Sequence, residues 1–142
     1  MNVFIFQSTL ERFDLRKAIS PQDNNTWYAT RYRSAMKPGD TVLFWMAGIE
    51  EIRGLYGWGH LTSEPYIKDS WDTYGVDVEY DVKFQNVILA TDIKKNKLLS
   101  KLLIIRAPQA TNFLLSDKEA KEILKLINDS GEIAPDLSEG VV

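Results

Sequence analysis

A glycine-spaced run in the middle of the chain constrains the fold more than any other feature. Gly54, Gly57 and Gly59 interrupt the segment GLYGWGHL, which otherwise has the composition of a β-strand. Glycine inside a strand marks a bulge, a barrel corner or the close approach of another group. The spacing also differs from the G-x-G-x-x-G dinucleotide fingerprint, which has to lie between a strand and a helix. We therefore expect a bent barrel strand here and no phosphate-cradling loop.

The remaining segments predict a sheet with a few short helices. Strands are predicted at residues 3–6, 41–46, 76–82 and 103–106, and the third of these alternates apolar and acidic residues, the period of a strand with one solvated face. Helices are predicted at residues 11–19, 94–103 and 117–128, the last behind the capping box S-D-K-E. Strands outnumber helices and do not alternate regularly with them. We predict an α+β fold, a small mixed β-barrel with peripheral short helices.

Length and composition indicate one domain. A chain of 142 residues with 44% hydrophobic residues can bury one ordinary core. After residue 128 the helical period ends and Gly, Pro and acidic residues accumulate, so we expect a domain over 1–128 and a polar tail or linker over 129–142. No apolar stretch approaches membrane-spanning length, and the N-terminus lacks a basic leader. We expect a soluble, cytoplasmic protein without a membrane partner.

The side-chain inventory excludes several kinds of chemistry. There is no cysteine, so thiolate metal sites are excluded, and the single His60 cannot build a zinc centre by itself. His60 lies in an apolar strand, where we expect an ordinary hydrogen bond and not a catalytic role. Asp77, Glu79 and Asp81 share a strand face that solvent alone would explain. We expect no enzyme activity, no catalytic residue, no metal and no cofactor.

Four tryptophans mixed with tyrosines and arginines indicate binding of a flat ligand such as a nucleobase. Trp45 and Trp58 lie in strand-like apolar runs, so we expect them to pack in the core. Trp27 and Trp71 lie at the edges of polar segments, where an aromatic ring can face a cavity. The net charge of −3 has the wrong sign for gripping a long duplex but leaves room for a small basic rim.

Five motifs occur in an order that resembles the EVE domain of the PUA-like superfamily. They are FIFQS, TWY before KPGDTVLFW, GLYGWGHLTSEPY, VDVEYDVKF and RAPQATNFLLSDKEAKEIL, and together they extend to about residue 128. The order is also similar to that of YTH domains, whose members read N6-methyladenine. This resemblance implies a PUA-like mixed β pseudo-barrel, a nucleic-acid-binding role and no catalytic activity.

The resemblance also implies a pocket for a modified base. Trp27 matches one wall of the methyl-base cage of YTH domains, and Trp71 is similar in placement to a second wall. Asp14 lies where those domains have a polar residue that bonds the base edge; the alternative is an ordinary helix surface charge. Tyr28 matches a position whose main chain contacts the base, and Ser8, at the end of FIFQS, completes the predicted pocket.

Basic residues around this pocket are expected to contact the nucleic-acid backbone. Arg106, in the R-x-x-Q of RAPQ, resembles an arginine that holds a phosphate; its alternative is a surface salt bridge. Arg31 and Arg33 would add to the basic rim. Gln7 departs from the family pattern, because many YTH domains have lysine there.

Together these features predict a reader of a modified base in DNA or RNA. The base would be methylated or hydroxymethylated cytosine, or N6-methyladenine, and the domain would serve a modification-dependent restriction or RNA-regulatory system, with a nuclease or ATPase as partner. The alternative is a regulatory domain that binds a protein, a peptide or a small ligand without specificity for nucleic acid.

Overall fold

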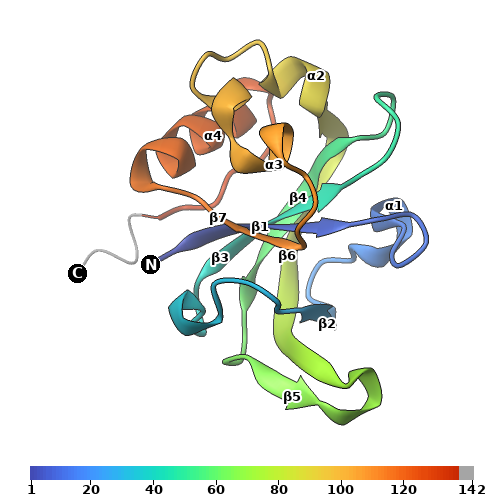
Figure 1. Ribbon diagram of the computed structural model, residues 1–142. Helices are drawn as coiled ribbons and strands as arrows, with labels where there is room; N and C mark the ends of the chain where they lie inside the picture. Colours follow the sequence, from blue (N-terminus) through green and yellow to red (C-terminus); the bar gives the residue numbers. More distant parts are fainter. Residues whose placement is uncertain (138–142) are drawn as a thin grey trace.

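All described strands form one mixed sheet that curls into a half-barrel, and the helices lie around this sheet (Figure 1). The computed structural model describes residues 1–137. The strands are β1 (Val3–Ser8), β2 (Asn24–Tyr28), β3 (Thr41–Met46), β4 (Gly54–Leu61), β5 (Tyr66–Lys68), β6 (Thr73–Leu89) and β7 (Asn112–Leu114). The α-helices are α1 (Leu15–Ala18), α2 (Ala90–Ile93), α3 (Leu103–Arg106) and α4 (Asp117–Asp129), with 3-10 turns η1 (Arg33–Ala35), η2 (Asp69–Trp71) and η3 (Leu99–Lys101).

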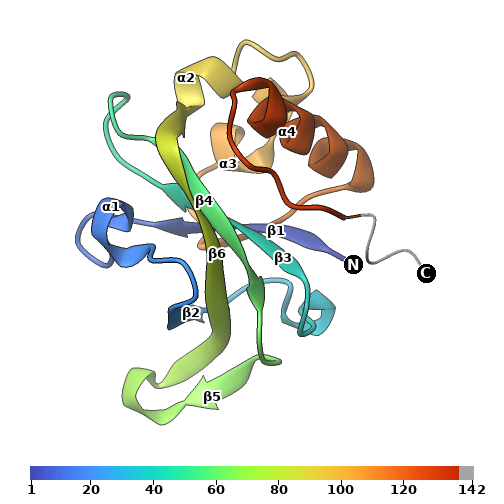
Figure 2. The same cartoon turned by 180° about the vertical axis from the view of Figure 1, so that it is seen from behind.

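The strand order β2-β6-β4-β3-β1-β7 mixes parallel and antiparallel pairs, and β5 adds to β6. Only β1 and β3 run parallel, and the other described pairs are antiparallel. Helices α2, α3 and α4 gather on one side of the sheet, and α1 lies apart from them, as both views show (Figures 1 and 2). The predicted α+β fold, a mixed β pseudo-barrel with peripheral short helices, is confirmed, and its sheet forms a half-barrel.

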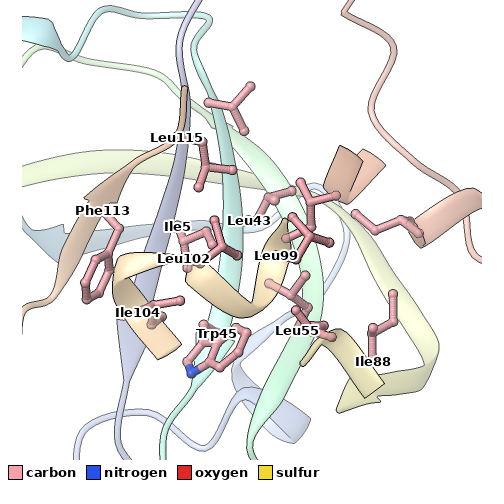
Figure 3. Close-up of a cluster of buried hydrophobic side chains, with 14 of the residues drawn as sticks. Ile5, Leu43, Trp45, Leu55, Ile88, Leu99, Leu102, Ile104, Phe113 and Leu115 are labelled. Carbon is pink, nitrogen blue, oxygen red and sulfur yellow. The ribbon is translucent and has the colours of Figure 1, made fainter. Parts of the chain in front are cut away.

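The central strands are buried on both faces, which explains their continuous apolar sequence. From β1, Phe4 and Phe6 point into the half-barrel, whereas Val3 and Ile5 point toward α3 and α4. The sheet therefore has a core on each side. Figure 3 shows the core between the sheet and the helices, in which Trp45 of β3 packs among leucines and isoleucines. Trp45 is fully buried, as expected.

Two glycines of β4 allow β6 to approach unusually closely. A Cβ atom at Gly57 would lie 2.2 Å from the carbonyl oxygen of Val82, and one at Gly59 would lie 2.0 Å from that of Glu79. The register between β4 and β6 shifts next to both glycines, so the ladder contains bulges at these points. The predicted bent barrel strand is therefore confirmed.

Four helix and strand predictions need correction. The helix expected at residues 94–103 is a turn followed by the 3-10 turn η3, because α2 ends at Ile93. The helix expected at residues 11–19 is only α1, because Asp14 caps its first turn and residues 9–13 form a separate turn. The strand expected at residues 103–106 is the helix α3, because a short apolar run cannot distinguish one helical turn from a strand; of its four residues only Ile104 is fully buried. Strand β6 is longer than predicted, because bulges let it continue past residue 82.

The segment after α4 lies against the sheet as far as it is described. The indole Nε1 of Trp58, a half-buried side chain at the core edge, donates a hydrogen bond of 2.8 Å to the carbonyl oxygen of Ile133. The Glu132 carboxylate accepts from the backbone N–H groups of Gln85 and Asn86. Up to residue 137, the predicted tail thus packs on the domain, and residues 138–142 lie outside the described residues. None of the described helices is long and apolar enough to cross a membrane.

Candidate nucleic-acid interface

The end of β2 presents two neighbouring aromatic residues to a turn that follows β1. Residues 9–13 form this turn, called the 9–13 turn below. The Arg12 guanidinium lies 4.6 Å from the ring centroid of Tyr28, and the Phe13 ring lies 5.2 Å from that of Trp27. Consecutive residues of the turn therefore cover consecutive residues of the strand, through a cation–π contact and an aromatic contact.

Ser8 holds the 9–13 turn in place. Its hydroxyl oxygen accepts a hydrogen bond of 3.2 Å from the Phe13 N–H and lies within donating distance of the carbonyl oxygens of Thr9 and Phe13. The Ser8 side chain is itself almost completely buried. Ser8 therefore lies beside Phe13, and through it next to Trp27, as a buried anchor of the turn.

Trp27 lies inside the half-barrel and does not face an open cavity. It is 2% exposed, with the rings of Phe13 and Phe44 each 5.2 Å from its own. Its Nε1 donates a 3.0 Å hydrogen bond to the hydroxyl of Tyr80, which also accepts from Asn25. Burial raises the pKa of the Tyr80 hydroxyl. The expectation of an open wall at Trp27 does not match this position.

Trp71 lies on the opposite face of the β2–β6 ribbon from Trp27. Trp27 pairs with Val76 and points inward with it, whereas Tyr28 pairs with Gly75 and points outward. Trp71 covers this outer position: a Cβ at Gly75 would lie 3.2 Å from its indole. Because the pleat separates the two tryptophans, they do not form two walls of one cage in this structure.

Trp71 instead forms a stack with the side chain of Tyr28. The two ring centroids are 4.5 Å apart with planes 35° from parallel, and Lys68 Nζ lies 4.8 Å from the Trp71 ring. Together with Arg12 these residues form a row of cation, tyrosine, tryptophan and cation, called the Tyr28–Trp71 stack below. Both rings are half-buried, so part of each remains available to a ligand.

Asp14 adopts the alternative role of a helix-terminal charge. It caps α1 by accepting from the Arg16 N–H, and its carboxylate makes two further hydrogen bonds of 2.9 and 2.8 Å with the Arg16 guanidinium. The hydrogen bonds from Arg16 hold the pKa of the Asp14 carboxyl below its usual value. A base edge would have to compete with Arg16 for this carboxylate.

The three arginines expected to contact the nucleic-acid backbone are all exposed. Arg31 and Arg33 are exposed after β2, and the Arg33 guanidinium lies 4.2 Å from the Tyr74 ring and donates to the carbonyl oxygen of Thr30. Arg106 is exposed at the end of α3. All three are therefore accessible to a ligand.

A small crevice opens beside the 9–13 turn on the helix side of β1. Its volume is about 150 Å³, and Gln7, Thr9 and Arg12 line it together with Ala47 and residues 108–111. Gln7 Nε2 donates to the carbonyl oxygens at 108 and 110, while its Oε1 is buried and accepts no hydrogen bond within residues 1–137. Gln7 therefore ties β1 to the RAPQ loop.

Asn112 is a buried organising residue that sequence reasoning missed. Its Nδ2 donates a 2.9 Å hydrogen bond to the carbonyl oxygen of Tyr28, so this main-chain group is already engaged. Its Oδ1 accepts from the backbone N–H groups of Thr30 (2.8 Å) and Arg31 (3.3 Å). The only signal in the sequence is one amide residue in the short apolar strand NFL.

Replacing Asn112 with alanine should lower the free energy of unfolding by about 2–4 kcal/mol, because several buried backbone groups lose their partner. Asn112→Asp keeps the acceptor for Thr30 but loses the donor to Tyr28, and it places a charge in a buried site. Urea unfolding of both variants measures the change. Stability of the alanine variant equal to wild type would show that the loop after β2 does not depend on Asn112.

Of the described residues, only His60, Glu79 and Asp81 form a group that could hold a metal ion, and they lie outside this interface.

The described chain has the PUA-like fold, a mixed sheet curled into a half-barrel with a few short helices. The chain belongs to the EVE domain family, whose model matches residues 2–126. No curated protein sequence matches it.

Three solved structures illustrate the similarity of the fold. A hypothetical protein from Leishmania major has a TM-score of 0.76 and 19% identity, with 93% of this chain and 98% of that chain covered. Human THYN1 in complex with DNA containing 5-methylcytosine has a TM-score of 0.71 and 16% identity, with 89% and 97% covered. The YTH domain of Zygosaccharomyces rouxii MRB1 in complex with N6-methyladenosine RNA has a TM-score of 0.56 and 13% identity, with 96% and 90% covered.

Proposed function

We propose that this EVE domain reads a modified base in DNA or RNA and has no catalytic activity of its own. The observation that carries the proposal is the Tyr28–Trp71 stack, flanked by Arg12 and Lys68 and adjacent to the Phe13–Trp27 contact. Aromatic faces combined with cations suit single-stranded or flipped-out bases. Relatives of the same fold occur in complex with 5-methylcytosine DNA and with N6-methyladenosine RNA, which supports this class of ligand.

In the proposed binding mode the modified base enters at the mouth of the half-barrel, on the face of Trp27 that Phe13 now covers. The 9–13 turn moves aside to admit it, which releases the hydrogen bond from the Phe13 N–H to Ser8 at the end of β1. A neighbouring base stacks on Trp71, and Arg31, Arg33 and Arg106 contact phosphates. Asp14 would bond the base edge only after releasing Arg16.

Stacking and methyl burial contribute unequally in this mode. Each aromatic partner of a base contributes about 1–3 kcal/mol, which offsets an unstacking cost of a few kcal/mol. Burial of one methyl group adds only about 0.8 kcal/mol, roughly a fourfold change in affinity. Selectivity for a methylated base must therefore come mostly from pocket shape and from hydrogen bonds to the base edge.

Replacing Trp71 with alanine should weaken binding of a short modified oligonucleotide by about 1–3 kcal/mol, a factor of roughly 5–150. Trp71→Phe keeps an aromatic face and should lose less. Fluorescence anisotropy against matched strands with methylcytosine, hydroxymethylcytosine, methyladenine or no modification, in both DNA and RNA, measures the effect. Equal affinity of wild type and Trp71→Ala for every strand would contradict a role of the stack.

The wider biological role proposed here is that of a cytoplasmic recognition module. A reader without catalytic activity needs an effector, for which a nuclease or ATPase of a restriction or RNA-regulatory system is suited. The competing proposal, a regulatory domain for a protein, a peptide or a small ligand, is based on a cavity of about 300 Å³. Its lining is apolar at Met1, Val3, Leu115, Ala120 and Leu137 and polar at Asn2, Asp117 and Lys121. Oligonucleotide binding that depends neither on modification nor on salt would favour that second role.

A further inference from the structure

Three potential metal ligands gather on the outer face of the sheet where β4 and β6 pair. His60 of β4 lies opposite Glu79 of β6 in the antiparallel register. Donor atoms of His60, Glu79 and Asp81 all lie within 4.8 Å of one another, and His60 Nδ1 is 2.7 Å from Asp81 Oδ2. All three side chains are half-buried. The cluster is therefore held by two paired strands and not by a loop.

A bulge in β6 lies at the third side chain of this group. Trp58 pairs with Val82 and Gly59 pairs with Tyr80, so Asp81 is an additional residue that faces no partner across the ladder. Regular alternation along the strand places Asp81 on the same face of the sheet as Glu79. Because the bulge leaves Asp81 without a partner across the ladder, its carboxylate lies beside His60.

The charges of the cluster are not balanced by its own residues. Two carboxylates share one imidazole, which leaves a local charge of −2 with neutral His60 and −1 with protonated His60. The Glu79 carboxylate forms no hydrogen bond or ion pair within residues 1–137, although its side chain is half-buried. A bound divalent cation would compensate this charge and give Glu79 a partner.

We propose that His60, Glu79 and Asp81 bind a divalent transition-metal ion of the zinc type. An imidazole nitrogen with two carboxylate oxygens is a donor set that suits such ions, and water would occupy the open positions. Metal–ligand bonds of about 2.0–2.2 Å in tetrahedral geometry place donor atoms about 3.4 Å apart, so small side-chain rotations from the present separations suffice. The bound ion would link β4 to β6 beside Gly59, and this proposal does not depend on nucleic-acid binding.

Calorimetric titration of the intact protein with zinc chloride, in a buffer that does not chelate metals, tests the site. We expect one ion bound per chain and a rise of the melting temperature that grows with zinc concentration. Cobalt(II) titration provides a spectroscopic readout, because its visible absorption reports coordination by nitrogen and oxygen ligands. No saturable binding of either ion would overturn the proposal.

Two isosteric substitutions on the same face of β6 separate a specific site from general attraction to acidic residues. Glu79→Gln should still fold, because this carboxylate has no partner to lose, and should weaken zinc binding about tenfold or more. Asp77→Asn removes a charge two residues away from Glu79, where the carboxylate instead accepts from Thr26 and Tyr66, and should leave zinc affinity nearly unchanged. Equal weakening by both substitutions would overturn the site.

Discussion

Replacing Gly59 with alanine should severely destabilise the fold, because the added methyl group meets main chain and not a movable side chain. Its Cβ would lie 2.0 Å from the carbonyl oxygen of Glu79 and 3.1 Å from Tyr80 Cα. No side-chain rotation can relieve this contact, since the backbone alone fixes a Cβ position. Strands β4 and β6 would have to separate at their bulge. We expect a loss above about 4 kcal/mol in the free energy of unfolding, measured by urea denaturation.

Gly131→Ala is the matched control, because it tests backbone conformation without a steric contact. Gly131 has φ +82°, and a methyl group added there would have no atom within 4 Å, so alanine should cost only about 1–2 kcal/mol. Similar losses in both variants would mean that the close approach of β4 and β6 is not what requires glycine at position 59.

The fold was predictable to the extent that local sequence reports strand period and glycine spacing. The continuous apolar runs of β1 and β3, the capping box of α4 and the glycines of β4 each carry their own signal. The helix α3 was not predictable, because four residues that are mostly apolar fit a helical turn and a strand equally well. The choice between them depends on the neighbouring elements.

The candidate site was predictable in its residue types but not in its geometry. Trp27 and Trp71 were both expected to face one pocket, because each borders a polar segment. Which face Trp27 occupies depends on its pairing with Val76, a partner 49 positions away in the sequence. The stacking of Tyr28 on Trp71 and the covering of Trp27 by Phe13 likewise arise only when distant segments meet. Such contacts leave no local period.

Replacing Trp27 with alanine should lower the free energy of unfolding by about 3–5 kcal/mol. The substitution removes a buried indole that contacts Phe13 and Phe44, and it takes one hydrogen bond from the Tyr80 hydroxyl. Trp27→Phe keeps most of the apolar volume and leaves Tyr80 its bond from Asn25, so it should cost about 2 kcal/mol. Urea unfolding measures both values, and a near-neutral alanine variant would contradict a core role for Trp27.

A large loss of stability means that weaker binding by Trp27→Ala would not by itself identify a base pocket. Phe13→Ala provides the decisive companion, because it uncovers one face of Trp27. If Phe13 occupies the place of the base, the Phe13→Ala variant no longer has the cost of displacing that ring. A modified oligonucleotide should then bind to Phe13→Ala more tightly than to wild type. Leu10→Ala, at an exposed position in the same turn, should leave affinity unchanged. Unchanged or weaker binding to Phe13→Ala would show that the base does not replace Phe13 on Trp27.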